Sequence, residues 1–347
     1  MPVSVVVGGQ FGSEGKGKVA QFITRTSSAS AVVRVGGPNS GHSAVANDGR
    51  LITLRQLPAG CIGTDAIVIL PAGSLIDVQL LRNEIDALGM TPARLRVDAK
   101  ASLVTAAHRQ TEVSDGLVEE IGSTGSGTGA ALRERMSRVT THMRAKDEAA
   151  LAPFIEENTA SLLRALLDNN ERVVVEGTQG FGLSLWHATD YPFATSRDTT
   201  AAAFVAEAGL APHDVDDVAL VIRSFPIRVG GHSGPLPNEI EWPTLAKEAQ
   251  LPNDFHELTS ATRRVRRVAR FDPVVVRDAI TCNRPHRVFL NHMDYIDPRW
   301  KQTGKLSREA SDFLIRIEAE IGREIDYFGF GPDITESRNR LLRKAAA

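Results

Sequence analysis

The hydrophobic positions of this chain form short apolar runs, separated by stretches with helical spacing. The runs are rich in β-branched residues and have the length of single strands: Val3–Val7, Ala31–Val35, Ala66–Leu70, Leu95–Val97, Arg172–Val175, Val218–Ile222 and Arg287–Leu290. Asp77–Leu88 and Asp147–Leu167 have the spacing of amphipathic helices. Strands that are apolar throughout are typical of parallel sheets covered on both faces. The pattern therefore predicts an α/β fold with a central, mostly parallel sheet flanked by helices.

Composition narrows the class of protein. The chain has 347 residues, of which 42% are hydrophobic and 24% charged, and its formal net charge is −2. This near-neutral balance argues against a general nucleic-acid-binding protein. We find no repeat, no long linker and no apolar run near 18 residues, so we expect a single large domain over residues 1–347, in the cytoplasm and without a membrane partner.

The first chemical motif is the segment GGQFGSEGKGK, Gly8 to Lys18, directly after the first apolar run. A strand, a Gly-rich turn with a lysine and a helix start together form a phosphate cradle, because free N–H groups and an ammonium group face the same point. The spacing does not fit the ordinary P-loop, in which Ser or Thr follows the lysine. The alternative is a plain strand–helix connection, which would not need both Lys16 and Glu14.

This segment resembles the nucleotide loop of the adenylosuccinate synthetase family, whose members join aspartate to C6 of a 6-oxopurine nucleotide. The resemblance implies a fold of that family, related to P-loop NTPases, and a requirement for Mg²⁺. It also places Gly12, Glu14, Gly15, Lys16 and Gly17 against the donor nucleotide, with Lys16 catalytic. Ser13 stands where the family has its catalytic Asp, a position that contacts both the purine and the metal.

The second motif is RVGGPNSGHSA, Arg34 to Ala44, which resembles the family's Gly-Gly-x-Asn-x-Gly-His-Thr segment. The resemblance implies that Asn39 lies near the substrate phosphate and that the Gly41 carbonyl binds Mg²⁺. It places His42 on the transferred phosphoryl group and Ser43 beside it at the donor nucleotide. Transfer of a charged phosphoryl group needs such donors and a metal to offset its charge.

The third motif, Ile121 to Arg138, contains GSTGSGTG. In the family, the positions of Thr124 and Gly125 bind the phosphate of the purine nucleotide. The position of Arg138 belongs to an arm that reaches the 5′-phosphate in a neighbouring subunit, which implies a homodimer. Alternatively, Arg138 is an exposed charge on a helix. Ser126 replaces an Arg that is common in the family.

The fourth motif, Glu176 to Thr200, resembles the family's Glu-Gly-Ala-Gln-Gly segment and the Tyr-Pro-x-Val-Thr-Ser segment after it. The resemblance places Gln179 at the base edge as a catalytic amide and Thr195 at the 5′-phosphate.

The fifth motif is TSATRRVRRVARFD, Thr259 to Asp272. An arginine cluster can bind nucleic acid, but the near-neutral chain and the lack of interleaved aromatic residues weaken that alternative. In the family, the matching loop binds the carboxylates of L-aspartate, for which guanidinium groups are well suited. Thr262, Arg264 and Arg266 fall on the family's binding positions, and Arg264 also contacts the purine nucleotide. We expect the remaining arginines to form a solvated face.

Two distal motifs extend the resemblance from residue 3 to residue 335. In FLNHMDYID, His292 replaces the Lys of the family's guanine-reading element and Asp294 is retained. FGFGPDIT supplies Gly329, Gly331 and Pro332 over the donor nucleotide. His292 favours ATP or dATP as the donor, whereas Asp294 would suit guanine and leaves GTP open.

The replacement of Asp by Ser13 determines the predicted substrate. Serine is a poor general base near neutral pH, but its hydroxyl can accept a hydrogen bond from an amine, and guanine carries a 2-amino group beside N1. A shortened chain with a residue other than Asp at this position resembles the phage-type 2-aminoadenylosuccinate synthase branch, which condenses dGMP with aspartate. The compartment would then be the host cytoplasm.

Three questions stay open in the sequence. The alternative functions are an ordinary adenylosuccinate synthetase acting on IMP with GTP, and a non-catalytic nucleotide-binding regulator. The group that removes the N1 proton could be a phosphate oxygen, a water or Glu14. The preference for a deoxy- over a ribonucleotide also stays open.

Overall fold

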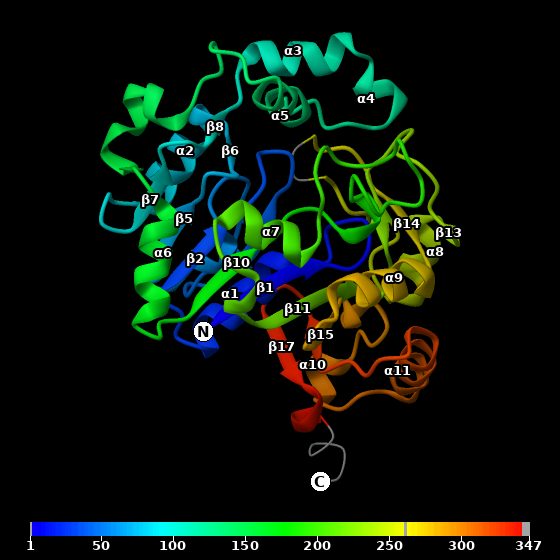
Figure 1. Cartoon of the computed structure of the whole chain (residues 1–347). Coiled ribbons are helices and arrows are strands. Elements are labelled where there is room, and N and C mark those ends of the chain that lie inside the picture. Colours follow the sequence, from blue (N-terminus) through cyan, green and yellow to red (C-terminus); the bar gives the residue numbers. More distant parts are fainter. Residues whose placement is uncertain (1, 260–261, 342–347) are drawn as a thin grey trace.

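The computed structural model describes residues 2–259 and 262–341, and its largest element is a ten-stranded sheet (Figure 1). The strand order is β17-β16-β15-β11-β1-β10-β2-β5-β7-β9. Neighbouring strands are parallel throughout, except that β16 and β17 pair antiparallel at one edge. The predicted α/β fold with a mostly parallel sheet is confirmed.

All seven apolar runs are strands of this sheet. They are β1 (Val3–Gly8), β2 (Ala31–Arg34), β5 (Ile67–Leu70), β7 (Leu95–Asp98), β10 (Val173–Glu176), β11 (Val215–Arg223) and β15 (Arg287–Asn291). The remaining three strands were not predicted from the sequence: β9 (Ile155–Glu156), β16 (Tyr327–Phe330) and β17 (Ile334–Ser337). β9 and β17 are the two edge strands of the sheet, and β16 lies between β17 and β15.

The two faces of the central strands bury their side chains against different helices. Val5 and Val7 of β1 belong to the larger core cluster, with Leu163 of α6 (Thr159–Asp168) and Phe204 of α7 (Ala201–Ala208). Val6, which points to the opposite face, packs in a second cluster with Val19 and Ile23 of α1 (Lys16–Thr26). Successive strand residues point to opposite faces, so an apolar run without alternation is what a sheet covered on both sides requires.

The described residues form eight further helices. They are α2 (Val78–Leu88), α3 (Ala106–Ser114), α4 (Leu117–Glu120), α5 (Thr128–Met136), α8 (Trp242–Glu248), α9 (Pro273–Asn283), α10 (Trp300–Thr303) and α11 (Arg308–Ile321). In Figure 1, α3, α4 and α5 lie together at the top of the molecule, away from the C-terminal hairpin β16–β17.

Three small sheets complete the fold. They are an antiparallel sheet of β12 (Ile227–Arg228), β14 (Arg267–Ala269) and β13 (Glu239–Ile240), an antiparallel pair of β3 (His42–Val45) and β4 (Leu51–Leu54), and a parallel pair of β6 (Leu75–Ile76) and β8 (Ser102–Leu103).

One of the two predicted helices differs from the structure. Asp77–Leu88 is the helix α2, and Asp77 caps it by accepting a hydrogen bond from the Leu80 N–H. The expected helix Asp147–Leu167 begins only at Thr159, where Asn158 is the N-cap. The residues before it form 3₁₀ turns and the edge strand β9, and Pro153 lacks the N–H that a continuous helix would need.

No helix in the described part of the chain is long and apolar enough to span a lipid bilayer.

The packing of the central sheet can be tested with Leu220→Ala. Leu220 of β11 is fully buried in the larger core cluster, so its truncation should lower the free energy of unfolding by about 2–5 kcal/mol. Ile315→Ala is the control, because Ile315 is 67% exposed on α11. Urea unfolding measures both variants, and equal losses would contradict the assigned core.

Candidate active site

The site lies where five neighbouring parallel strands end. In the order β15, β11, β1, β10 and β2, these strands run in one direction, so the loops that follow them meet at one edge of the sheet. Ligands of open α/β sheets bind at this edge. Four of the seven sequence motifs, those containing Lys16, His42, Gln179 and His292, leave the sheet here.

The Gly-rich loop after β1 has a backbone that few residues other than glycine adopt. Gly12 and Gly15 have φ values of 92°, and Ser13 between them has φ 57°. Gly15 is the N-cap of α1 and offers no side chain, so the first N–H groups of the helix are not capped. This arrangement suits an anion at the helix N-terminus.

Glu14 and Lys16 form a buried ion pair inside this loop. The Lys16 Nζ lies 2.7 Å from the Glu14 Oε2, and both side chains are at most 2% exposed. The other carboxylate oxygen, Oε1, accepts hydrogen bonds from the Gln10 and Gly12 N–H groups. Because both oxygens of Glu14 are held within the loop, the structure argues against Glu14 as the group that takes the purine proton.

Close backbone contacts join this loop to the other two Gly-rich segments. A Cβ at Gly17 would lie 2.9 Å from the Cβ of His42 and 2.9 Å from the carbonyl oxygen of Ser43. A Cβ at Gly180 would lie 2.4 Å from Glu14 Oε1, and one at Gly8 would lie 2.7 Å from the Gln179 carbonyl oxygen. These glycines are therefore required by close approach, and they bring Lys16, His42 and Gln179 to one place.

His42 is oriented by two buried partners that the sequence analysis did not assign. Its Nδ1 lies 2.7 Å from Oε1 of Glu176 and 2.5 Å from Nη1 of Arg34. Glu176 is fully buried and also accepts the N–H groups of Ala59 and Gly60. Burial and the charge of Arg34 lower the pKa of His42 to about 3, so the ring is neutral at physiological pH.

Arg223 at the end of β11 fixes the Ser13 turn and also escaped the sequence analysis. Its Nη1 donates to the Ser13 carbonyl oxygen at 3.1 Å. The amide of Gln10 binds the backbone N–H and carbonyl of Arg223, at 2.8 and 3.1 Å. Its position directly after the apolar run Val218–Ile222 is the sequence feature that could have indicated a role for Arg223 at this edge of the sheet.

The segment around Thr124 and Gly125 approaches the site from α5. A Cβ at Gly37 would lie 2.8 Å from Thr128 at the start of α5, and one at Gly129 would lie 3.4 Å from the Cβ of Ser196, next to Thr195. The Thr124 hydroxyl pairs with that of Ser126 at 2.8 Å.

The other residues predicted to bind the purine nucleotide differ in exposure. Asn39, Gly41 and Thr195 are partly exposed. Arg138 is exposed beyond the end of α5.

The arginine-rich loop places its arginines in different surroundings. Thr262 pairs with Thr259 through their hydroxyls at 2.6 Å, and Arg264 is exposed. Arg266 is only 10% exposed and lies 3.5 Å from Glu257.

The expectation that the remaining arginines form a solvated face is wrong for Arg267, which makes a two-pronged ion pair with Glu239 and is only 23% exposed. Arg270 pairs in the same way with Glu248 and is half exposed. These contacts tie β14 to its neighbouring segments.

The two distal motifs meet beside α1. The Asn291 amide donates to the Glu14 carbonyl oxygen at 2.8 Å, and Asp294 Oδ1 accepts the Gly331 N–H at 2.9 Å.

Two basic side chains near these motifs have lowered pKa values. Lys18 donates to the Gly331 carbonyl oxygen, and burial lowers the pKa of Lys18 to about 8. Burial and Arg223 lower the pKa of His292 to about 3. Gly329 is packed against Asn291, and Pro332 is exposed.

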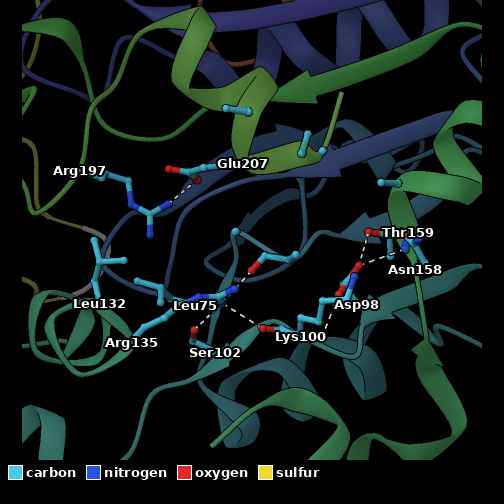
Figure 2. Close-up of a pocket in the computed structure, with 16 residues that line it drawn as sticks. Leu75, Asp98, Lys100, Ser102, Leu132, Arg135, Asn158, Thr159, Arg197 and Glu207 are labelled. Carbon is cyan, nitrogen blue, oxygen red and sulfur yellow. Dashed lines mark hydrogen bonds and ion pairs between the residues drawn. The ribbon is translucent and has the colours of Figure 1, made fainter. Parts of the chain in front are cut away.

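A separate cavity of about 400 Å³ lies among α5, α6 and α7 (Figure 2). No predicted site residue lines it. Arg135 donates to the Lys100 carbonyl oxygen and the Ser102 hydroxyl, Arg197 pairs with Glu207, and Asp98 accepts the Thr159 hydroxyl. Because these polar groups bind one another, the cavity is the weaker candidate for a site.

Comparisons with known proteins identify one family. The model described as adenylosuccinate synthetase matches residues 5–152 and 143–301. The adenylosuccinate synthetase of Thermococcus onnurineus is 36% identical over 341 residues, which cover 96% of this chain and 97% of its own length. That of Methanocaldococcus jannaschii is 35% identical over 348 residues, and the match covers 97% of each chain.

Two solved structures share the fold. The succinoaminodeoxyadenylate synthetase (PurZ) of cyanophage S-2L, bound to dGMP and dATP as an energy donor, superposes with a TM-score of 0.82 and 29% identity over 99% of this chain and 98% of its own. The fully ligated adenylosuccinate synthetase of Plasmodium falciparum gives a TM-score of 0.81 at 21% identity over 96% of this chain and 98% of its own. At 21% identity, the second likeness shows the fold alone.

The neutral state of His42 predicts a pH-dependent stability. His42 keeps a pKa of about 3 in the folded protein but regains about 6.5 on unfolding, so the unfolded chain binds more protons between these values. The free energy of unfolding should fall as the pH drops below 6.5, with a contribution from His42 of up to about 1.4 kcal/mol per pH unit. His42→Gln should remove this contribution. Urea unfolding at pH 7, 6 and 5 measures the slope.

The control for this experiment is His256→Gln, because His256 is exposed. Its slope should match that of the unmodified protein. An unchanged slope in His42→Gln would show that His42 is not held neutral by the fold.

Proposed function

The chain belongs to the adenylosuccinate synthetase family of carbon–nitrogen ligases, and we propose that it condenses dGMP with L-aspartate at purine C6. The product would be N6-succino-2-amino-2′-deoxyadenylate, a precursor of 2,6-diaminopurine nucleotides. Hydrolysis of a nucleoside triphosphate would drive the reaction through a 6-phosphoryl intermediate.

Ser13 is the single observation that carries this proposal. It stands in place of the family's Asp, in a left-handed turn held by Arg223, and is only partly buried. Its hydroxyl makes no hydrogen bond with the residues that the structure describes, so it is available as an acceptor for the 2-amino group of guanine. A smaller, neutral side chain also leaves room for that group. The likeness to a phage enzyme bound to dGMP supports the same substrate.

The second candidate is an ordinary synthetase that acts on IMP. The curated archaeal synthetases favour it, because they are 35 and 36% identical to this chain. They also match over 97% of their own lengths. The short chain was taken to favour the phage branch, but ordinary synthetases of the same length exist, so chain length does not separate the two functions.

We assign phosphoryl transfer to Lys16, His42 and Gln179. Lys16 would stabilise negative charge on the transferred group, and His42, whose Nδ1 is held by Glu176, would contact that group through Nε2. Donation from Nε2 requires the protonated ring, which a bound phosphoryl group together with Glu176 would favour. Asn39, Thr124, Gly125 and Thr195 would hold the phosphate of the purine nucleotide. Because Glu14 is sequestered, a phosphate oxygen or a water is the better candidate for removal of the N1 proton.

Mg²⁺ would bind between the nucleotides, with the Gly41 carbonyl and the Ser13 hydroxyl as protein ligands. These are hard oxygen donors, which suit Mg²⁺. The described residues contain no group of three or more His, Cys, Asp or Glu side chains that could hold a metal ion. The protein ligands are therefore few and neutral, and substrate phosphates would complete the site. When bound, the ion would offset charge on the phosphoryl group.

For the energy donor we propose ATP or dATP. Asp294 already accepts a hydrogen bond from the Gly331 N–H, which occupies one of the oxygens that could read guanine. His292 is neutral and does not reproduce the charge of the family's Lys.

L-Aspartate would bind at the arginine-rich loop, through Thr262, Arg264 and Arg266. Exposed Arg264 is free to reach a carboxylate, and Arg264 would also contact the purine nucleotide. We propose a homodimer in which exposed Arg138 reaches the partner's purine nucleotide.

Ser13→Asp tests the substrate assignment. The new carboxylate is larger than the hydroxyl and would crowd the 2-amino group, and it restores the family's residue, so the ratio of dGMP to IMP efficiency should fall about 10²–10³-fold in kcat/KM. Steady-state kinetics with each nucleotide at saturating aspartate measure the ratio.

Ser13→Ala is the matched control, because it removes the acceptor without adding a charge. It should lower the dGMP efficiency less than Ser13→Asp does and should not favour IMP strongly. If the ratio does not fall in Ser13→Asp, guanine is not selected here and the IMP function stands.

Subunit complementation tests the role of Arg138. Lys16→Ala and Arg138→Ala should each be inactive, whereas a mixed dimer keeps one site with both residues intact. After subunit exchange, an equal mixture should recover about a quarter of the unmodified activity, since half of the dimers are hybrid and each has one complete site. Arg133→Ala, in the exposed ion pair with Asp115, should remain active. No recovery despite exchange would show that Arg138 does not act in the partner's site.

A further inference from the structure

Glu257 lies at the centre of a buried charge cluster that connects three separate parts of the chain. Its Oε1 accepts a close hydrogen bond from Arg223 Nη2 and a second from the Tyr295 hydroxyl at 3.0 Å. Its Oε2 lies 3.2 Å from Arg223 Nη1 and 3.5 Å from Arg266 Nη1. The carboxylate thus contacts the end of β11, the arginine-rich loop and the turn after β15.

The cluster is fixed on the side of the Gly-rich loop. Arg223 is fully buried, and the Nη1 that binds Glu257 also donates to the Ser13 carbonyl oxygen. The Gln10 amide holds the backbone of Arg223 on both its N–H and its carbonyl. Movement of Arg223 would therefore move the Ser13 turn.

The cluster is also fixed on the side of the arginine-rich loop. The Arg266 N–H donates to the Glu257 carbonyl oxygen at 2.9 Å, and Leu258 and Val265 form an antiparallel bridge. Residues 257 and 266 thus form the base of this loop, with Thr262 and Arg264 beyond it. The position of Glu257 sets the direction in which the loop leaves the fold.

The charges in the cluster do not balance. Two guanidinium groups face one carboxylate, and the Nε–H groups of Arg223 and Arg266 have no hydrogen-bond partner among the described residues. Burial alone would raise the pKa of Glu257, but the charge and hydrogen bond of Arg223, together with the charge of Arg266, hold it well below its usual range. Glu257 is therefore ionised, and the remaining positive charge favours an anionic substrate nearby.

We propose that Glu257 is a positioning residue that joins the aspartate-binding loop to the Ser13 turn through Arg223. This inference rests on the proposed placement of aspartate at Thr262, Arg264 and Arg266. Glu257 does not contact the reacting atoms; it holds Arg266 and the base of the loop in one geometry relative to the purine. Binding of the two substrates is thereby coupled through a rigid, buried ion pair.

Glu257→Gln tests the role directly, because the amide keeps the size of the side chain and removes its charge. The KM for aspartate should rise about tenfold, the range typical of coupled neighbouring groups, while the KM of the nucleoside triphosphate changes less than about threefold. Thermal unfolding followed by circular dichroism checks that the variant folds. A purely structural defect would lower the active fraction, and with it kcat, without raising the KM for aspartate.

Glu248→Gln is the matched control. It removes the same charge from a two-pronged pair with Arg270, which is about half exposed and lies outside the proposed site. Its KM for aspartate should equal that of the unmodified enzyme. An equal rise in both variants, or no rise in a folded Glu257→Gln variant, overturns the proposal.

Arg223→Lys tests the connection to the Ser13 turn. Lysine keeps the charge but cannot reproduce the planar fork that holds Glu257 and the Ser13 carbonyl together. In this background, Glu257→Gln should raise the KM for aspartate much less than it does alone. Independent, multiplicative effects would show that Glu257 and Arg223 are not coupled.

All variants are assayed with both dGMP and IMP. The KM for aspartate is expected to shift with whichever nucleotide is turned over, so failure of dGMP turnover defeats the proposed substrate but leaves this test intact. If Glu257→Gln is folded and inactive with both, Glu257→Asp replaces it. This variant keeps the charge on a shorter side chain, and its KM for aspartate should lie above the unmodified value; an unchanged KM overturns the proposal.

Discussion

The buried ion pair of Glu14 and Lys16 is the interaction on which the candidate site depends. A carboxylate without water is stable only when its oxygens are fully paired, and Glu14 meets this condition with Lys16 and the N–H groups of Gln10 and Gly12. These bonds close the loop around its own side chain. The glycines at 8 and 180 are then required, since a Cβ at either would lie within 3 Å of the Glu14 carboxylate.

The same solution recurs on both sides of the loop. Glu176 at the end of β10 is buried and fixes His42, and Glu257 fixes Arg223 and Arg266. Each of the three carboxylates holds at least one basic side chain of the site. The site is therefore organised before substrates bind, which lowers the cost of ordering positive charge around anionic ligands.

This arrangement gives Ser13 its significance. The turn that carries it is held by Arg223 and not by its own side chain. A change from Asp to Ser at this position can therefore alter the chemistry offered to the purine while the backbone around it stays in place. Because the backbone of this turn does not depend on the side chain at position 13, proteins of one fold could act on different 6-oxopurine nucleotides.

The sequence alone determined seven of the ten strands of the central sheet and the edge at which the motifs meet. Both follow from local pattern, because a fully apolar run needs cover on both faces and a parallel sheet gathers its loops at one end. The family resemblance identified Lys16, His42 and Gln179, whose motifs leave the sheet at that edge. The helix was predicted to begin at Asp147 because apolar residues recur at helical spacing there. It begins instead at Thr159, since Pro153 lacks an N–H and Asn158 caps the helix.

Only the tertiary structure decided which charges face one another. Nothing in the sequence pairs Glu14, Glu176 or Glu257 with the groups they bind, and those partners lie up to 142 positions away, as in the pair of Arg34 and Glu176. Within one arginine-rich motif, Arg264 is exposed while Arg266 is buried against Glu257. Burial and pairing depend on the whole packed chain, because the pKa and position of each group are set by neighbours that no local pattern specifies.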